Sequence, residues 1–366
     1  MYVIIVDILN FDFYRPTRTG KAYMLAQVAD RLLGAWWGAF LGDAAAMPTH
    51  GFSSVKLLTQ DYGNVSDFLA PKPTHPESVL HTLPMPQLPQ EYDFIGDKRR
   101  NIWKIRDAHP HCTLSAGENT LPMYLALHLT ASMAEKGCFD LNDWCERYRI
   151  VMTTPDVVND TFISSIHRKY FENLAAGKSP EQNGCPEAHI SDIPIFLPLM
   201  LYALRNFEKT QMDIMRAIRK FATGESAFSS ASFVAEILYN IIKGATLEET
   251  LYQKMTPDRH VSLAFPLRRW IKNHDDEQAI NSTGIFATTE EGMPLSLYIA
   301  LKYNNNFRKA IFKNANIGGE TTGRGAVIGM ILGAQIGFAN LPQDLIAKLK
   351  YAGEIQALGD MLKNLI

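Results

Sequence analysis

Cysteine, net charge and long apolar runs are all scarce in this chain of 366 residues. Four cysteines are too few for a disulfide scaffold and favour a reducing compartment. The 36 Lys and Arg side chains nearly balance the 38 Asp and Glu side chains, and this net charge of −2 argues against a nucleic-acid-binding surface. No apolar run approaches the roughly 18–20 residues that cross a bilayer, and the first residues lack the basic region of a signal peptide. We therefore expect a cytoplasmic protein that binds neither nucleic acid nor membranes.

The remaining composition and its periodicity predict an all-α fold. Hydrophobic residues make up 46% and charged residues 20%, which are the proportions of a globular chain. Apolar residues recur three and four positions apart along most of the sequence, which is the pattern of helices with one buried face. The expected helices include residues 21–47, 120–134, 160–174, 195–205, 210–221, 233–242, 295–302 and 324–338. The best alternating, strand-like pattern covers only residues 2–8.

The length alone favours two domains, because single cores tend to stop growing near roughly 250–300 residues. However, no linker separates two hydrophobic patterns, and the motifs described below need to meet at one cleft. We therefore predict one domain over residues 22–366, preceded by an extension over residues 1–21. Residues 71–89 hold six of the 19 prolines, a density that excludes a helix and predicts an extended surface loop.

Two predicted helices carry glycines at intervals of four. The glycines are Gly34, Gly38 and Gly42 in the first helix, and Gly325, Gly329, Gly333 and Gly337 in the second. A glycine inside a helix costs roughly 0.5–1 kcal/mol relative to alanine, so this spacing needs a reason. Residues four apart share one helix face, and a face without side chains lets two backbones approach closely. We predict that both helices are central and packed tightly, and each is a candidate partner for the other.

A glycine-rich turn precedes the second of these helices. Residues 316–325 read Asn-Ile-Gly-Gly-Glu-Thr-Thr-Gly-Arg-Gly, so backbone N–H groups and the positive end of a helix dipole would face an anion there. Glu320 could add a carboxylate for a cation. The turn is not a P-loop, because the Gly-Lys-Ser/Thr ending is missing.

Two further segments place polar side chains next to a predicted helix end. Glu118 and Asn119 stand just before a helix whose first turn holds a proline. The spacing of Ser115 and Glu118 also fits a capping box, which is the simpler interpretation of that carboxylate. At the end of the first glycine-rich helix, Asp43 and His50 follow each other closely.

Together, these three segments resemble the ADP-ribosylglycohydrolase superfamily, which includes dinitrogenase-reductase-activating glycohydrolases, ADP-ribosylarginine and ADP-ribosylserine hydrolases, and J1-type crystallins. The family's opening Gly-Asp pattern is similar to residues 38–50, its Thr-Asp-Asp-Thr motif to residues 117–120, and its closing Gly-Gly-Asp-Thr-Asp-Thr motif to residues 318–323. A weaker match places the family's middle segment at residues 191–199. The resemblance implies a single all-α domain with a central cleft.

The resemblance also implies a hydrolase that cleaves a glycosidic bond to ribose in ADP-ribose-type substrates, either ADP-ribosylated proteins or small molecules. Glu118 and Glu320 would be the catalytic carboxylates that orient the attacking water. The positions implied to bind the ligand are Asp43, His50, Asn119, Gly318, Gly319 and Arg324. We expect Arg324 to bind the substrate's pyrophosphate, although a pairing with Glu320 or with a neighbouring carbonyl group explains this arginine equally well.

The sequence departs from the family at the metal ligands. The family typically holds two Mg²⁺ ions, and the positions that remain for them here are Glu118, Asn119, Glu320 and Thr322. Two carboxylates, an amide and a hydroxyl form a weakened set, because Mg²⁺ is usually bound through carboxylates. One or two weakened Mg²⁺ sites and no metal at all both stay open. The alternative function is therefore a catalytically inactive member of this fold that binds ADP-ribose, a nucleotide or a protein.

Other polar groups carry weaker hypotheses. His109, His111 and Cys112 lack the second Cys/His pair of an ordinary zinc site. Asp160 follows a Thr-Thr-Pro segment and fits helix capping. His189 lies beside the middle motif, where a core or surface position is the better interpretation.

Overall fold

The computed structural model of the protein describes residues 18–178 and 185–366. Helices dominate these residues, and no β-strand occurs among them apart from isolated bridges between single residues. The predicted all-α class is therefore confirmed. None of the described helices is both long and apolar enough to cross a bilayer. The strand-like pattern at residues 2–8 and most of the predicted extension over residues 1–21 lie outside the described residues.

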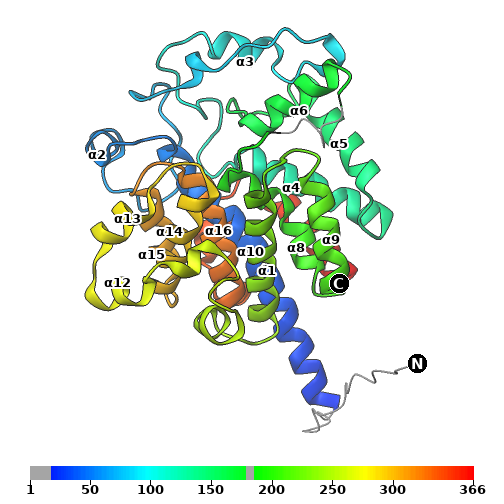
Figure 1. Cartoon of the computed structure of the whole chain (residues 1–366), viewed down its shortest axis with the longest axis vertical. Helices are drawn as coiled ribbons and strands as arrows, with labels where there is room; N and C mark the ends of the chain where they lie inside the picture. Colours follow the sequence, from blue (N-terminus) through cyan, green and yellow to red (C-terminus); the bar gives the residue numbers. More distant parts are fainter. Residues whose placement is uncertain (1–17, 179–184) are drawn as a thin grey trace.

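Short turns join most of the helices, whereas long segments with little regular structure precede and follow the helix at residues 96–102 (Figure 1). The first half contains α1 (Arg18–Ala46), α2 (Val55–Tyr62), α3 (Gly96–Ile102), α4 (Leu121–Lys136), α5 (Leu141–Thr153) and α6 (Ser165–Ala175). The second half contains α8 (Leu197–Tyr202), α9 (Phe207–Ile218), α10 (Glu225–Ile242), α11 (Leu247–Glu249), α12 (Leu267–Asn273), α13 (Asp276–Thr283), α14 (Thr289–Lys302), α15 (Phe307–Ala315), α16 (Thr321–Ile336), α17 (Gln343–Ile346) and α18 (Ala352–Leu365). The short 3₁₀ helices are η1 (Met47–Thr49), η2 (Leu80–Thr82), η3 (Gln90–Tyr92), η4 (Ile190–Phe196), η6 (Val261–Ala264) and η7 (Phe338–Asn340), and η5 (Thr250–Lys254) is a π-helix.

Helices α1 and α16 lie side by side at the centre of the molecule and touch through their glycines (Figure 1). The facing pairs are Gly42 with Gly325, Gly38 with Gly329, and Gly34 with Gly333, so the two helices run antiparallel. A Cβ atom on Gly38 would lie 2.1 Å from the carbonyl oxygen of Gly329, and one on Gly329 would lie 1.9 Å from that of Gly38. Only a residue without a Cβ atom allows this approach. The predicted close packing of these two helices is confirmed.

The antiparallel pairing brings two polar segments together. Helix α1 ends at Ala46, and η1 carries the chain on to His50. Helix α16 begins at Thr321, directly after Glu320. Because the C-terminal end of α1 lies against the N-terminal end of α16, His50 and Glu320 meet although 270 positions separate them in the sequence.

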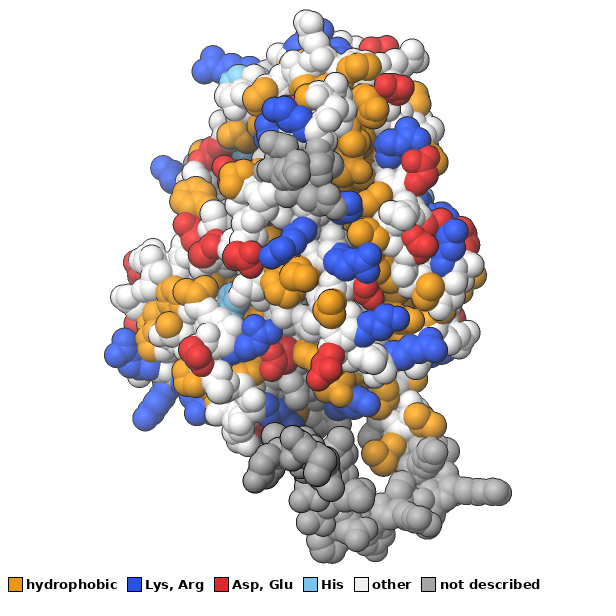
Figure 2. Space-filling model, turned by 45° about the vertical axis from the view of Figure 1, so that its right-hand side comes forward, with side chains coloured by type: hydrophobic (Ala, Val, Ile, Leu, Met, Phe, Trp, Pro, Cys, Tyr) orange, Lys and Arg blue, Asp and Glu red, His pale blue; other side chains and the backbone are white. Residues whose placement is uncertain are grey.

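The other helices surround this central pair. Helices α10 and α14 pack on α16, and α4 packs on η4 and α18. Residues 71–89 contain no α-helix, as predicted, and only the short 3₁₀ turn η2 interrupts their irregular path. Figure 2 shows positive and negative side chains interspersed across one face of the molecule, as the near-zero net charge leads one to expect.

Candidate functional site

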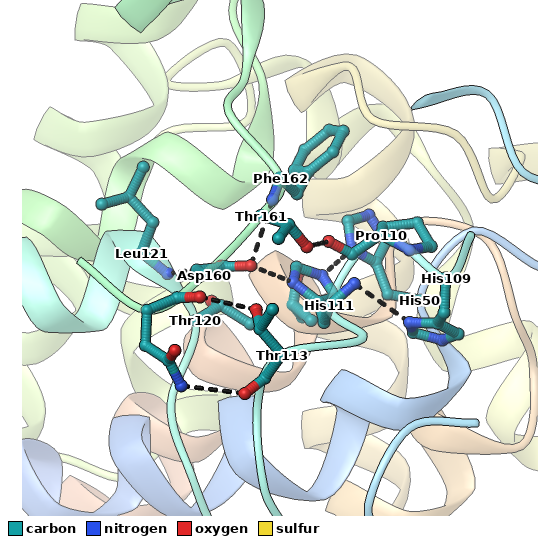
Figure 3. Close-up of polar contacts among 12 residues, drawn as sticks. His50, His109, Pro110, His111, Thr113, Thr120, Leu121, Asp160, Thr161 and Phe162 are labelled. Carbon is teal, nitrogen blue, oxygen red and sulfur yellow. Dashed lines mark hydrogen bonds and ion pairs between the residues drawn. The ribbon is translucent and has the colours of Figure 1, made fainter. Parts of the chain in front are cut away.

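Four buried side chains form a continuous hydrogen-bonded chain where α1 and α16 meet. His50 Nε2 lies 2.8 Å from Glu320 Oε2, and His50 Nδ1 lies 2.5 Å from His111 Nε2. The chain ends at Asp160, whose Oδ1 lies 2.7 Å from His111 Nδ1 (Figure 3). All four side chains are at most 6% exposed, so water screens these contacts very little.

The geometry of these four side chains determines how many protons they share. A carboxylate only accepts hydrogen bonds, so His50 donates to Glu320 through Nε2–H and His111 donates to Asp160 through Nδ1–H. The remaining contact, between His50 Nδ1 and His111 Nε2, has room for one hydrogen. The two imidazoles therefore hold three N–H protons and one positive charge between them.

Burial and charge act in opposite directions on these groups. Burial alone would raise the pKa of Glu320, but the charge of His50 and hydrogen bonds from His50 and Thr322 lower it to about 2. Burial alone would lower the pKa of His50, but the charges of Glu320 and Asp160 raise it above its ordinary value. The pKa of Asp160 is lowered because the charge of His111 and its hydrogen bonds outweigh burial. At neutral pH both carboxylates are therefore ionised, and His50 holds its proton more strongly than a free imidazole does.

Loops on either side hold His111 and Asp160 in place (Figure 3). The N–H of His111 donates to His109 Nδ1 at 3.0 Å, and His109 Nε2 lies 3.0 Å from the carbonyl oxygen of Pro48. Burial lowers the pKa of His109 well below its ordinary value, so this ring is neutral and donates to Pro48 through Nε2–H. Asp160 Oδ2 accepts a 2.9 Å hydrogen bond from the N–H of Leu121 at the start of α4. Asp160 is thus a capping residue, as the sequence suggests, but it caps α4, which precedes it in the chain.

A small cavity lies against the imidazole pair. It is lined by His50, His111, Asp160 and Thr322, together with Ser164, His167 and Ser191 from the start of α6 and from η4. Its free space of about 10 Å³ is close to what a single water molecule needs. Glu320 lies behind His50 and Thr322, which both contact it. The groups that line the space for a bound water therefore include both imidazoles and Asp160, but not Glu320.

Glu118, the second predicted catalytic carboxylate, faces a different cavity. Its Oε2 accepts hydrogen bonds of 2.8 Å from the N–H of Ser115 and from Lys350 Nζ. The Ser115 contact is the one that the capping-box interpretation predicts. Asp160 lines both cavities and so lies between them. The structure does not bring Glu118 and Glu320 into one cavity.

Asp43 and Asn119 connect α1 to the start of α4. Asp43 accepts hydrogen bonds from Asn119 Nδ2 at 2.9 Å and from the N–H and hydroxyl of Thr120 at 2.8 and 2.6 Å. Asn119 Nδ2 also donates to the carbonyl oxygen of Phe40 at 2.8 Å. Burial raises the pKa of Asp43 to about 6 in spite of these hydrogen bonds. Both residues thus join α1 to the start of α4, and Asn119 also lines the cavity that Glu118 faces. Their role in ligand binding stays a prediction.

The glycine-rich turn before α16 packs against backbone. Gly318 and Gly319 have φ values of +82° and +70°, and Cβ atoms on them would lie 2.3 and 1.9 Å from the carbonyl oxygens of Phe52 and Ile285. The N–H of Gly319 donates to Phe52 at 2.7 Å, and that of Glu320 donates to Ile285 at 2.8 Å. These two N–H groups are engaged within the protein and are not free for the anion that the sequence predicts at this turn.

Arg324 is 0% exposed and holds the same turn together. Its Nε donates to Asn314 Oδ1 at 3.0 Å, and its two terminal nitrogens donate to the carbonyl oxygens of Ile285, at 2.8 Å, and Gly318. Burial lowers its pKa to about 10, so the guanidinium stays charged at neutral pH. Of the interpretations that the sequence allows, an arginine bonded to neighbouring carbonyl groups matches the structure, and one that faces a pyrophosphate does not.

The four positions that the resemblance assigns to Mg²⁺ do not form a metal site. Within the described parts of the chain, no three His, Cys, Asp or Glu side chains gather in a way that could hold a metal ion. Glu118 and Asn119 line one cavity and Thr322 lines the other. The oxygens of Glu320 already accept hydrogen bonds from His50 and Thr322. Mg²⁺ requires several oxygen ligands in one octahedral shell, so the residues present do not fit it.

His111 and Asp160 belong to the site although the sequence does not single them out for it. The one available signal is the pair of histidines at 109 and 111, which comes just before the Glu118 motif. The contact of His111 with Asp160 spans 49 positions and lies outside every segment that resembles the family. Spacing along the chain could not reveal it.

Comparisons with known proteins agree with the resemblance. A family model described as ADP-ribosylglycohydrolase matches residues 24–366. Among solved structures, a chain described as "ADP-ribosylglycohydrolase-related protein complex" aligns with a TM-score of 0.60 and 21% identity, over 93% of this chain and 99% of that chain. An identity this low shows a shared fold alone. No curated protein sequence matches.

Proposed function

Because the chain belongs to the ADP-ribosylglycohydrolase family, we propose that it hydrolyses a glycosidic bond to ribose in an ADP-ribose-type substrate. The observation that carries this proposal is the buried chain of side chains from Glu320 through His50 and His111 to Asp160, set against a cavity for one water. Titratable groups with shifted pKa values beside a cavity are typical of catalytic sites. The substrate class comprises ADP-ribosylated proteins and small-molecule conjugates of ADP-ribose.

The imidazole pair would supply the acid–base chemistry. In the hydrolysis, the bond from the ribose C1′ to the leaving atom breaks and a bond from C1′ to a water oxygen forms. One proton must reach the leaving atom and one must leave the water. The proton between His50 and His111 is given to the leaving atom, and the pair regains a proton from the water. The pair therefore ends the reaction in its starting state.

The two carboxylates would support this proton transfer. Asp160 lines the cavity in its ionised form, so its charge stabilises the positive charge that develops on the ribose in an oxocarbenium-like transition state. Glu320 accepts the Nε2–H of His50 and thereby directs Nδ1 toward His111. Glu118 has no part in this proposal.

Release of ADP-ribose tests the proposed hydrolysis. The purified chain is incubated with peptides ADP-ribosylated on arginine or serine and with small-molecule conjugates, once with Mg²⁺ and once with EDTA. We expect turnover that agrees within about twofold between the two conditions, because the residues present do not fit Mg²⁺. His50→Gln should lower turnover by about 10³-fold, since a general acid–base group typically contributes roughly 10²–10⁴-fold.

His81→Gln is the matched control, because His81 is exposed and lies outside the site. No turnover on any conjugate, combined with tight ADP-ribose binding in calorimetry, would instead indicate a catalytically inactive ADP-ribose-binding protein. Turnover that survives His50→Gln but is lost in Glu118→Gln would place the chemistry at the other cavity.

A further inference from the structure

A groove of about 1030 Å³ lies at the end of the molecule where Figure 1 shows α3. Two segments line it, one between residues 89 and 99 with η3 and the start of α3, and one between residues 149 and 159 with the end of α5. Small-molecule pockets are typically about 300–1,000 Å³ in volume and mostly apolar. This groove is at least as large, and charged side chains line much of it. Its size and lining therefore fit an extended polypeptide segment better than a small molecule.

The groove continues toward the imidazole pair along three consecutive residues. Val158 and Asn159 line both the groove and the cavity that Glu118 faces. Asp160 lines that cavity and also the cavity of the imidazole pair. Because consecutive Cα atoms are about 3.8 Å apart, these residues place the groove within roughly 10 Å of the imidazole cavity. A polypeptide segment in the groove would therefore lie next to the site.

The basic side chains of the groove are already engaged within the protein. Arg99 is 9% exposed and donates to three backbone carbonyl oxygens at 2.6 to 2.9 Å. Arg149 donates to both carboxylate oxygens of Glu146, at 3.1 and 2.7 Å. Lys98 Nζ donates to Asn159 Oδ1 at 2.9 Å. These contacts hold the walls of the groove together and leave the three cations little capacity for a ligand.

The acidic side chains of the groove are mostly without such partners. Asp93 forms an ion pair of 2.9 Å with Arg100. Glu91, Asp97 and Asp156 are exposed, and none of the three forms a hydrogen bond or an ion pair through its carboxylate with another described residue. The charge that the groove offers to a ligand is therefore negative. Charge complementarity favours a basic partner and disfavours an acidic peptide or a nucleic acid.

We propose that this groove binds a basic polypeptide segment of an ADP-ribosylated protein and so holds the modified residue of that protein near the imidazole pair. Lysine or arginine side chains of the segment would pair with Glu91, Asp97 and Asp156. The inference rests on the proposed function, because it takes the occupant to be the protein substrate of that hydrolysis. It also narrows the substrate class, since a small-molecule conjugate of ADP-ribose has no segment that could occupy the groove.

Binding of unmodified peptides tests the groove without any need for turnover. A fluorescent peptide of alternating lysine and serine, and a matched peptide of glutamate and serine, are titrated with the full chain at low salt while anisotropy is followed. We expect the lysine peptide to bind at least about 10-fold more tightly. Asp97→Lys and Asp156→Lys should each weaken its binding by about threefold, because exposed charge pairs contribute little individually. Asp258→Lys is the matched control, since Asp258 is exposed and lies outside the groove.

Turnover of modified peptides tests whether the bound segment belongs to the substrate. Two peptides carry ADP-ribose on one arginine, and this arginine is flanked by lysines in one peptide and by glutamates in the other. We expect kcat/KM to be at least about 10-fold higher for the lysine peptide, mainly through KM. The double variant Asp97→Lys and Asp156→Lys should reduce this preference to within about twofold. Its turnover of a small-molecule conjugate should stay unchanged.

The outcomes separate the groove from the proposed hydrolysis. Binding of the lysine peptide that depends on Asp97 and Asp156, without any turnover, supports the docking surface and removes the hydrolase. Turnover without a preference between the two modified peptides overturns the proposal and leaves the hydrolase intact. Equal binding of the two unmodified peptides, or no binding of either, overturns it as well. The exposed positions of both substitutions allow the variants to fold, and melting curves verify this.

Discussion

Glu118 and Glu320 stand in similar surroundings but have different partners. Each lies near the start of a helix, each is at most 5% exposed, and each has a lowered pKa. Glu320 is paired with the buried His50, which is bonded to a second imidazole. Glu118 is paired with Lys350, whose side chain is 40% exposed.

The side chain that is paired with each carboxylate determines whether proton transfer is available there. An imidazole gains or loses its proton near neutral pH, whereas a lysine ammonium acts as a fixed point charge. Proton transfer is therefore available at Glu320 and His50, but it is not available at Glu118 and Lys350. The second pair instead ties the segment before α18 to the segment before α4.

The largest expected difference between the two carboxylates concerns turnover. Glu320→Gln should lower ADP-ribose release by about 10²–10³-fold, because a neutral amide no longer holds the positive charge on the imidazole pair. Glu118→Gln should keep turnover within about threefold, because its partner takes no part in proton transfer. Single-turnover assays on both variants, with melting curves to show that they fold, measure this difference. Similar losses of turnover in the two variants would show that the two carboxylates do not differ in their catalytic roles.

The next largest expected effect concerns Arg324, which holds together the turn that precedes α16. Arg324→Leu should lower the free energy of unfolding by about 2–3 kcal/mol, because it removes the arginine donors to Asn314 Oδ1 and to the buried carbonyl oxygen of Gly318. Urea unfolding measures this loss, and Arg268→Leu is the matched control. Arg268 is 58% exposed and pairs with an exposed Glu248, so its removal should cost less than about 0.5 kcal/mol. A stable Arg324→Leu chain that no longer binds ADP-ribose would restore the pyrophosphate role for this arginine.

The fold could be predicted from the sequence because its determinants are local and periodic. Glycines at intervals of four, such as Gly38 and Gly329, mark helix faces that only another backbone can cover. Two such faces in one chain can cover each other, and in the structure α1 and α16 pair through them in antiparallel orientation. The meeting of His50 with Glu320 is a consequence of that pairing.

The site could be predicted only in part, because its polar atoms find partners far away in the sequence. From the sequence, the N–H of Glu320 is expected to face an anion. In the structure, this N–H donates to the carbonyl oxygen of Ile285. Arg324 looks like a phosphate ligand until the carbonyl groups around it are known. The unpaired oxygen of Asp192 appears only once every neighbouring donor has been placed. A motif gives the chemical type of a side chain, and long-range packing decides where that side chain points.

A smaller effect concerns stability at Glu118. Glu118→Gln and Lys350→Met should each lower the free energy of unfolding by about 1 kcal/mol, and their coupling in a double-mutant cycle should be about 0.5–1 kcal/mol. The value is modest because Lys350 is partly exposed and its charge is screened. Urea unfolding of the two single variants and the double variant gives the coupling. A coupling near zero would show that Tyr351, which donates to Glu118 at 3.2 Å, holds this carboxylate instead.

The smallest effect is the pH dependence of that same contribution. Burial would raise the pKa of Glu118, but the hydrogen bond from Lys350 and those from Ser115 and Asn159 lower it below its ordinary 4.5. A carboxylate with a lowered folded-state pKa adds stability above its unfolded-state pKa and loses it as pH falls through the folded-state value. The stability difference between the wild-type chain and Glu118→Gln should therefore stay constant from pH 7 to about pH 5 and shrink below pH 4.5, by less than about 1 kcal/mol. Urea unfolding across this range tests the sign, and a difference that grows toward acid pH would mean that Glu118 is not held as an anion by Lys350.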